Sequence, residues 1–170
     1  MNTLATVVLV GLTAVAFSAL SDEDAFMQKL AQAGMAEVAA GKMAESKGVS
    51  AEVREFGAMM VEHHSAANQK LEKLAITKGV SLPATAGEED LAAMKALQSK
   101  EGVRFDQAYV ASQVKAHEEA VELLKMEIAG SDDAETKAFA AQLLPTVESH
   151  LRDAYHLAGQ DDRAAALARR

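Results

Sequence analysis

The sequence predicts an all-α protein whose single domain is a four-helix bundle. Its composition disfavours a β-sheet, because the chain has no Trp, two Pro, two Tyr and five Phe, whereas good helix formers are abundant. Four segments of similar length repeat apolar residues at steps of three and four, which is the spacing of one face of a helix. A chain of 170 residues, 49% hydrophobic and 25% charged, is long enough to bury one sizeable core.

The first twenty residues differ from the rest of the chain. Residues 1–21 contain no charged side chain, and the run from Leu4 to Leu20 is apolar or small. The length of this run and the small residues near its end are typical of a secretory signal peptide, so we expect residues 1–20 to be cleaved. The alternative is an uncleaved membrane anchor, since no Lys or Arg precedes the apolar run. Either way we expect an exported protein, periplasmic or envelope-associated, that meets a membrane only through this segment if it is retained.

Residues 21–159 form the predicted bundle domain. Capping residues bound its helices: Ser21 and Ser50 are suited to helix starts, and Gly48, Gly79 and Gly130 to helix ends. The long helices are expected at about 22–47, 51–78, 103–129 and 131–158. Residues 160–170 are expected to be a frayed tail, acidic and then basic.

A long connection joins the second and third long helices. It consists of a polar link at 79–87 and a short extra helix at 88–98. A connection of this length either crosses the bundle from end to end or caps one end of it, and the sequence is compatible with both. In the last long helix, Pro145 removes one backbone hydrogen bond, so we expect a kink there.

Each long helix carries one ionisable side chain on its apolar stripe, near the middle of the helix. These residues are Glu37, His64, His117 and His150. With a rise of about 1.5 Å per residue, the two members of each helical hairpin differ in height by about 4.5 Å and about 9 Å. A carboxylate and several imidazoles are costly in a dry interior unless they are paired or bind a cation. We therefore expect the four side chains to converge.

Three neutral imidazoles and one carboxylate suit a transition metal, Zn²⁺, Cu²⁺, Fe or Ni²⁺, rather than Ca²⁺ or Mg²⁺. The chain has no Cys, which excludes thiolate ligands. The residue three positions before each of these histidines is Val, so the Glu-x-x-His motif of di-iron bundles is missing. The alternative to a metal is a buried Glu–His hydrogen-bond network that only fixes the fold.

The charge pattern and the remaining motifs exclude several other functions. The net charge is -8, and no block of basic residues precedes the short tail from Arg163 to Arg170, so nucleic acid is not an expected partner. Ser65 follows His64 directly, and adjacent helical residues point about 100° apart, so they form no Ser–His pair. No catalytic residue is predicted, and the sequence does not predict the oligomeric state.

Four stretches of the chain carry a familiar pattern. They are FMQKLAQAGMAEVAAG from Phe26, MMVEHHSAAN from Met59, FDQAYVASQVKAH from Phe105 and FAAQLLPTVESHL from Phe139. Together they resemble the bacterial domain of unknown function 4142 family over about residues 22–158. The resemblance implies an exported, ferritin-like helical bundle, and its recurring positions correspond here to Glu37, His64, Asn68, Asp106, Tyr109, His117, Pro145 and His150.

The resemblance also refines the expected site. It implies that His64, rather than His63, is the inward histidine, and this chain departs from the family by having His63 where an Asp is usual. We expect Asn68, Asp106, Tyr109 and His63 as partners that position the metal ligands.

Three functions are compatible with these observations. The first is an exported bundle that binds a transition metal, Zn, Cu or Fe, in metal handling or stress protection. The second is a non-catalytic structural or interaction protein of the envelope, whose buried Glu–His network only specifies the fold. A metal-dependent oxidoreductase or hydrolase is the third, and it requires an open coordination position.

Overall fold

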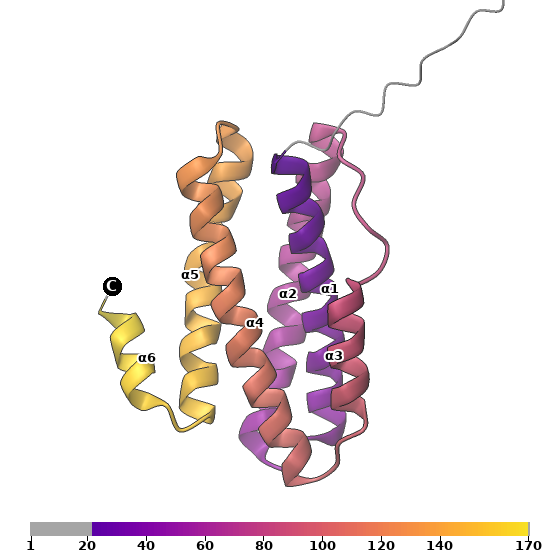
Figure 1. Cartoon of the computed structure of the whole chain (residues 1–170), viewed down its shortest axis with the longest axis vertical. Coiled ribbons are helices and arrows are strands. Elements are labelled where there is room, and N and C mark those ends of the chain that lie inside the picture. Colours follow the sequence, from indigo (N-terminus) through magenta and orange to yellow (C-terminus); the bar gives the residue numbers. More distant parts are fainter. Residues whose placement is uncertain (1–21, 170) are drawn as a thin grey trace, which may run out of the picture.

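The computed structural model describes residues 22–169, and all regular secondary structure in this range is helical (Figure 1). The helices are α1 (Asp22–Lys47), α2 (Ala51–Lys78), α3 (Glu88–Gln98), α4 (Val103–Gly130), α5 (Ala134–Leu157) and α6 (Asp161–Ala168). The four long helices and the short one at 88–98 were predicted from the sequence. The predicted signal peptide lies outside the described residues. None of the helices found between residues 22 and 169 combines the length and apolar character of a membrane span.

Capping chemistry sets the helix ends. The Ser50 hydroxyl accepts a hydrogen bond from the Val53 amide at 3.1 Å at the start of α2, and Gly79 ends that helix with φ of 70°. At the start of α5 the Asp133 carboxylate accepts from the Thr136 amide at 2.7 Å. α5 then continues through Pro145 to Leu157 without interruption.

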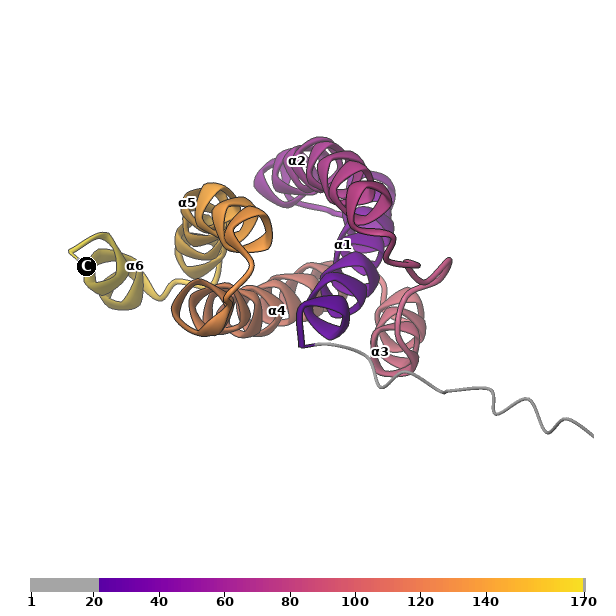
Figure 2. The same ribbon diagram turned by 90° about the horizontal axis from the view of Figure 1, so that it is seen from above.

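The four long helices surround one core. α1 packs along α2, and α4 packs along α5, so the chain forms two helical hairpins. α1 also contacts α4 and α2 contacts α5, which closes the arrangement seen end-on in Figure 2. The largest fully buried apolar side chains come from three of these helices and are Met27, Met60, Leu71, Phe105, Tyr109 and Leu124.

The long connection crosses the molecule from one end to the other (Figure 1). α2 ends beside the α4–α5 turn, where Lys78 Nζ lies 2.5 Å from Asp133 Oδ2. The connection then follows α1, because Gln28 donates to the Ser81 carbonyl at 3.1 Å and Lys47 donates to the Gln98 carbonyl at 2.6 Å. Of the two arrangements left open by the sequence, the structure therefore has the crossing connection.

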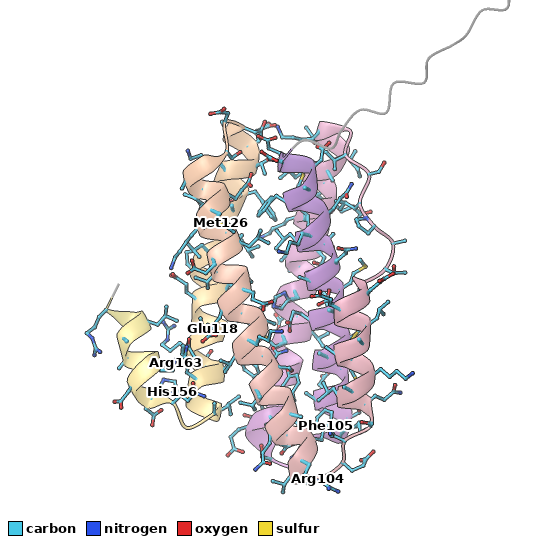
Figure 3. All side chains as sticks on the ribbon, in the orientation of Figure 1. Arg104, Phe105, Glu118, Met126, His156 and Arg163 are labelled. Carbon is cyan, nitrogen blue, oxygen red and sulfur yellow. The ribbon has the colours of Figure 1, made fainter. Side chains whose placement is uncertain are left out.

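The C-terminal segment corrects one prediction. Residues 161–168 form α6 instead of a frayed tail, because its apolar side packs on α5 and buries Ala164 to 1% exposure. Arg163 lies over the Tyr155 ring, 4.5 Å from its centroid, and also bonds the Glu118 carboxylate. Figure 3 shows Arg163, Glu118 and His156 close to α6.

Candidate metal centre

Three histidines from three helices meet in the interior. His64 comes from α2, His117 from α4 and His150 from α5. The centroids of the three rings lie 5.3–5.5 Å apart, and one ring nitrogen from each histidine lies within 4.8 Å of the other two. His117 and His150 are only 1% and 2% exposed, and His64 is half-buried. Both hairpins therefore contribute to one histidine cluster.

The backbone of α4 determines which nitrogen of His117 carries a proton. Its Nδ1 lies 3.0 Å from the Gln113 carbonyl oxygen one helical turn earlier. A carbonyl only accepts hydrogen bonds, so Nδ1 is the protonated nitrogen and Nε2 keeps a lone pair. That Nε2 is buried and has no hydrogen-bond partner among residues 22–169. The lone pair of His117 Nε2 is therefore available to coordinate a metal ion.

His150 also has a hydrogen-bond partner at one of its ring nitrogens, and this partner is His63. His63 Nδ1 lies 2.8 Å from His150 Nε2, and the two rings are stacked with an interplanar angle of 15°. When His150 Nε2 donates this hydrogen bond, His150 Nδ1 keeps its lone pair. In the described part of the chain, His150 Nδ1 and His64 Nε2 are also buried without a partner. All three histidines of the cluster therefore have one unpaired ring nitrogen.

Burial keeps two of the three imidazoles, those of His64 and His150, in their neutral form. Desolvation, reinforced by the neighbouring histidines, lowers the pKa of His64 to about 3 and that of His150 to about 2. Both imidazoles are then uncharged at neutral pH, which is the form that binds metals.

The three ring nitrogens lie farther apart than the ligands of a zinc site. Zn–N bonds of about 2.0–2.1 Å in a tetrahedral site place the ligand nitrogens about 3.3 Å apart. The three nitrogens, now within 4.8 Å of one another, would each have to move inward by about 1 Å, which small side-chain rotations supply. The donor set and its geometry fit a metal ion held by three histidines.

Glu37 lies beside the cluster but is not one of the three converging groups. Its side chain on α1 is 8% exposed, and its Oε2 accepts a hydrogen bond from Gln113 Nε2 at 2.7 Å. Burial raises the pKa of Glu37, while the nearby His117 and the Gln113 hydrogen bond oppose that rise. Three of the four predicted ligands therefore converge, and the fourth is within charge–charge range of His117.

Gln113 is a site residue that the sequence reasoning missed. Its side chain binds Glu37 and its carbonyl binds His117, so it connects two of the predicted ligands. The available signal was its position four residues before His117, which places an amide on the same apolar stripe.

Of the residues predicted to position the metal ligands, some lie near the histidine cluster and others do not. His63 contacts His150 directly, and Asn68 lines the same cavity as His64, with its amide oxygen 2.0 Å from where a Gly34 Cβ would lie. Asp106 is not near the cluster. It accepts hydrogen bonds from the Val49 and Ser50 amides at 3.0 and 2.9 Å, at the turn that joins α1 to α2.

Tyr109 is also separated from the histidines. It lies eight residues before His117, or about 12 Å along α4, and its ring packs against Phe56 and Phe105 with centroids 6.2 Å away. Burial raises the pKa of Tyr109, and the negative charge of Glu37 adds to this effect. Tyr109 therefore belongs to an aromatic part of the core, together with Phe56 and Phe105.

Comparison with known proteins agrees with the sequence resemblance. No curated protein and no solved structure matches the chain significantly. The family model described as domain of unknown function (DUF4142) matches residues 12–157. The match contains α1 to α5, and with them the three histidines, His63, Gln113 and Glu37. The chain therefore belongs to the DUF4142 family.

Proposed function

We propose that this protein is an exported, ferritin-like four-helix bundle that binds one transition-metal ion through His64, His117 and His150. It serves in metal handling or stress protection in the periplasm or the cell envelope. The observation that carries the proposal is the meeting of three imidazoles from three helices, each with one buried and unpaired ring nitrogen.

The unpaired nitrogens favour a metal over a purely structural hydrogen-bond network. Buried polar groups are nearly always paired in folded proteins. The cluster contains two links typical of a structural network, His63–His150 and Gln113–Glu37. Those links leave one nitrogen of each central histidine without a partner within residues 22–169, and a cation pairs all three at once.

The chemistry of the ligands favours a transition metal, and zinc, copper and iron are the ions proposed. Neutral imidazoles are good ligands for these ions and poor ones for Mg²⁺ or Ca²⁺. Glu37 interacts electrostatically with His117 and is the proposed fourth ligand. The ferritin-like assignment is supported by the connection that crosses from one end of the helices to the other.

The proposal of export rests on the uncharged apolar segment at residues 1–20. N-terminal sequencing of the protein isolated from the cell envelope tests it. A mature chain that begins near Ala19 is expected, whereas a retained Met1 would mean that the segment is an anchor or is not a signal.

Elemental analysis of the untagged protein tests metal binding. After loading with Zn, Cu or Fe and removal of free metal, we expect one ion per chain. His117→Gln and His150→Gln should each abolish stoichiometric binding. His156→Gln is the matched control, because this exposed histidine of α5 pairs with Asp161 away from the cluster. Equal metal content in all four proteins would place the metal elsewhere, and none in the wild type would support the structural network.

A further inference from the structure

A cavity leads from the surface to two of the three histidines of the candidate metal centre, His64 and His117. Its volume is about 560 Å³, and its walls come from α1, α2, α4, α5 and the start of α3. The buried side chains Glu37 and His117 line its inner part together with His64. Glu88 and Glu89, which also line it, are exposed and therefore lie at its outer rim.

The lining of this cavity is strongly negative. Five acidic residues line it, Glu37, Glu88, Glu89, Asp90 and Glu119, whereas Lys29 is the one Lys or Arg along it among residues 22–169. Asp90 and Glu37 both line the cavity, and the negative charge of Asp90 adds to the rise in the pKa of Glu37. A cation is attracted along the whole path, and an anion is repelled.

The inner end of the cavity offers a ligand for such a cation. His117 is 1% exposed, lines the cavity and has an Nε2 that no group of residues 22–169 bonds. This unpaired nitrogen is a separate observation from the acidic rim. The same cavity therefore has acidic residues that attract a cation at its rim and an imidazole nitrogen that can coordinate the cation at its inner wall.

The long connection brings the acidic residues to this place. Acidic side chains in the first turn of a helix stabilise it, and that alone accounts for their presence in α3. The position of these acidic residues beside the cavity has a different cause, which is the path of the connection. Gln28 holds Ser81 against α1, and the start of α3 at Gly87 then lies beside Gln32 of α1, over the cavity.

We infer that this cavity is the channel through which a hydrated metal cation reaches His64, His117 and His150, and that Glu88, Glu89 and Asp90 attract the cation into it. The inference rests on the proposed function. It names the free divalent cation, rather than an anionic metal complex, as the species that the protein takes up.

Rapid mixing of the metal-free protein with Co²⁺ tests the attraction, because bound Co²⁺ is followed by its visible absorption. The rim variant carries Glu88→Gln, Glu89→Gln and Asp90→Asn. We expect its association rate to fall on the order of tenfold at low ionic strength and the difference to shrink in high salt. The amount of Co²⁺ bound at saturation should not change.

A matched control separates the rim from the total charge. Glu52, Glu55 and Glu72 are exposed residues of α2 that do not line the cavity. Their triple change to Gln removes the same three charges, and the association rate should stay within about twofold of the wild type.

Filling the channel provides an independent measurement. Ala33→Phe on α1 and Ala120→Leu on α4 each add a large side chain to the cavity wall. Both uptake and chelator-driven release of Co²⁺ should slow in each variant, whereas Ala58→Leu at an exposed position of α2 should change neither rate. Two positions are used so that misfolding of one variant does not leave the inference untested.

The outcomes distinguish this inference from the proposed function. Rim and control variants that take up Co²⁺ equally fast, or channel-filling variants with unchanged rates, would overturn the channel while leaving the metal site intact. Failure of the wild type to bind any metal would instead overturn the proposed function, and the channel with it.

Discussion

At the scale of single residues, His63 controls which nitrogen of His150 is available to a metal. The two side chains meet through His63 Nδ1 and His150 Nε2 at 2.8 Å, which leaves His150 Nδ1 as the unpaired atom. Partners of this kind orient a ligand and raise its basicity. His63 itself is exposed, so its contribution to stability is small.

Substitution of His63 is therefore expected to affect metal affinity more than folding. His63→Ala should weaken binding about 10- to 100-fold, because His150 loses the acceptor that holds its ring and tautomer. His63→Gln should recover much of the affinity, since its amide oxygen can accept the same hydrogen bond. Competition with a chelator measures both affinities, and His156→Gln serves as the unaffected reference. Equal affinities for His63→Ala and the wild type would show that His63 has no positioning role.

The buried histidines also predict how the stability of the metal-free protein depends on pH. His64 and His150 have folded-state pKa values of about 3 and about 2, below the ordinary value of 6.5. Below pH 6.5 the unfolded chain binds protons that the folded chain does not, so stability falls as the pH falls. Glu37 acts in the opposite direction above pH 4.5, because its folded-state pKa is raised. Because two histidines act against one carboxyl group, the free energy of unfolding decreases overall as the pH falls.

Urea unfolding at pH 7, 6 and 5 tests this balance. The free energy of unfolding should decrease by on the order of 1 kcal/mol per pH unit below pH 6.5. His64→Gln and His150→Gln should each flatten this dependence, and Glu37→Gln should steepen it because the opposing group is gone. A pH dependence that is the same in all four proteins would contradict the assignment.

At the scale of helices, α1 and α2 approach each other through glycines. A Cβ on Gly57 would lie 2.7 Å from Ala44 Cβ and 2.8 Å from the Gly41 carbonyl oxygen. Both contacts are closer than real Cβ atoms allow, and the second is to backbone, which cannot move aside without shifting the helix. The first hairpin is therefore tightly packed because Gly41 and Gly57 face each other.

Gly57→Ala should consequently be destabilising. We expect a loss of about 1–3 kcal/mol in the free energy of unfolding, because α1 and α2 must separate to admit the methyl group. Gly130→Ala is the control, since a Cβ at the end of α4 meets nothing within 4 Å and the residue does not need positive φ. It should be neutral or slightly stabilising. Urea denaturation measures both, and similar midpoints would contradict the close contact.

At the scale of the whole molecule, the proposed metal joins the two hairpins. His64 belongs to the α1–α2 hairpin, and His117 and His150 belong to the α4–α5 hairpin. The two hairpins meet where α1 contacts α4 and where α2 contacts α5. An ion bound by these three histidines would hold the two hairpins together.

Metal loading should accordingly raise the melting temperature. A ligand that binds only the folded state contributes about 2.7 kcal/mol at a free concentration one hundred times its dissociation constant. Calorimetry of the metal-free and loaded forms should show this increase, and a chelator should reverse it. His117→Gln should melt at the same temperature with and without metal. A rise in that variant equal to the wild type would mean that the stabilising ion binds outside the cluster.

The fold was largely predictable from local signals. Ser50, Gly79 and the apolar spacing predicted α2, and the other long helices followed from similar patterns because caps and periodicity act over a few residues. α6 was missed because it packs on α5 and because Arg163 bonds Glu118, a residue 45 positions earlier in the chain. The path of the long connection was undecided for the same reason, since it depends on Gln28 and Lys47 of α1.

For the candidate site, too, some features were predictable from the sequence and others were not. The sequence by itself determined the helices α1 to α5 and the absence of thiolate ligands. It also determined that His64, His117 and His150 lie on apolar stripes, because helical periodicity shows which face of a helix a residue occupies. Only the tertiary structure decided that these three meet, that Glu37 binds Gln113 instead, and that Asp106 caps a distant turn. Those outcomes depend on the relative height and rotation of packed helices, which no local pattern encodes.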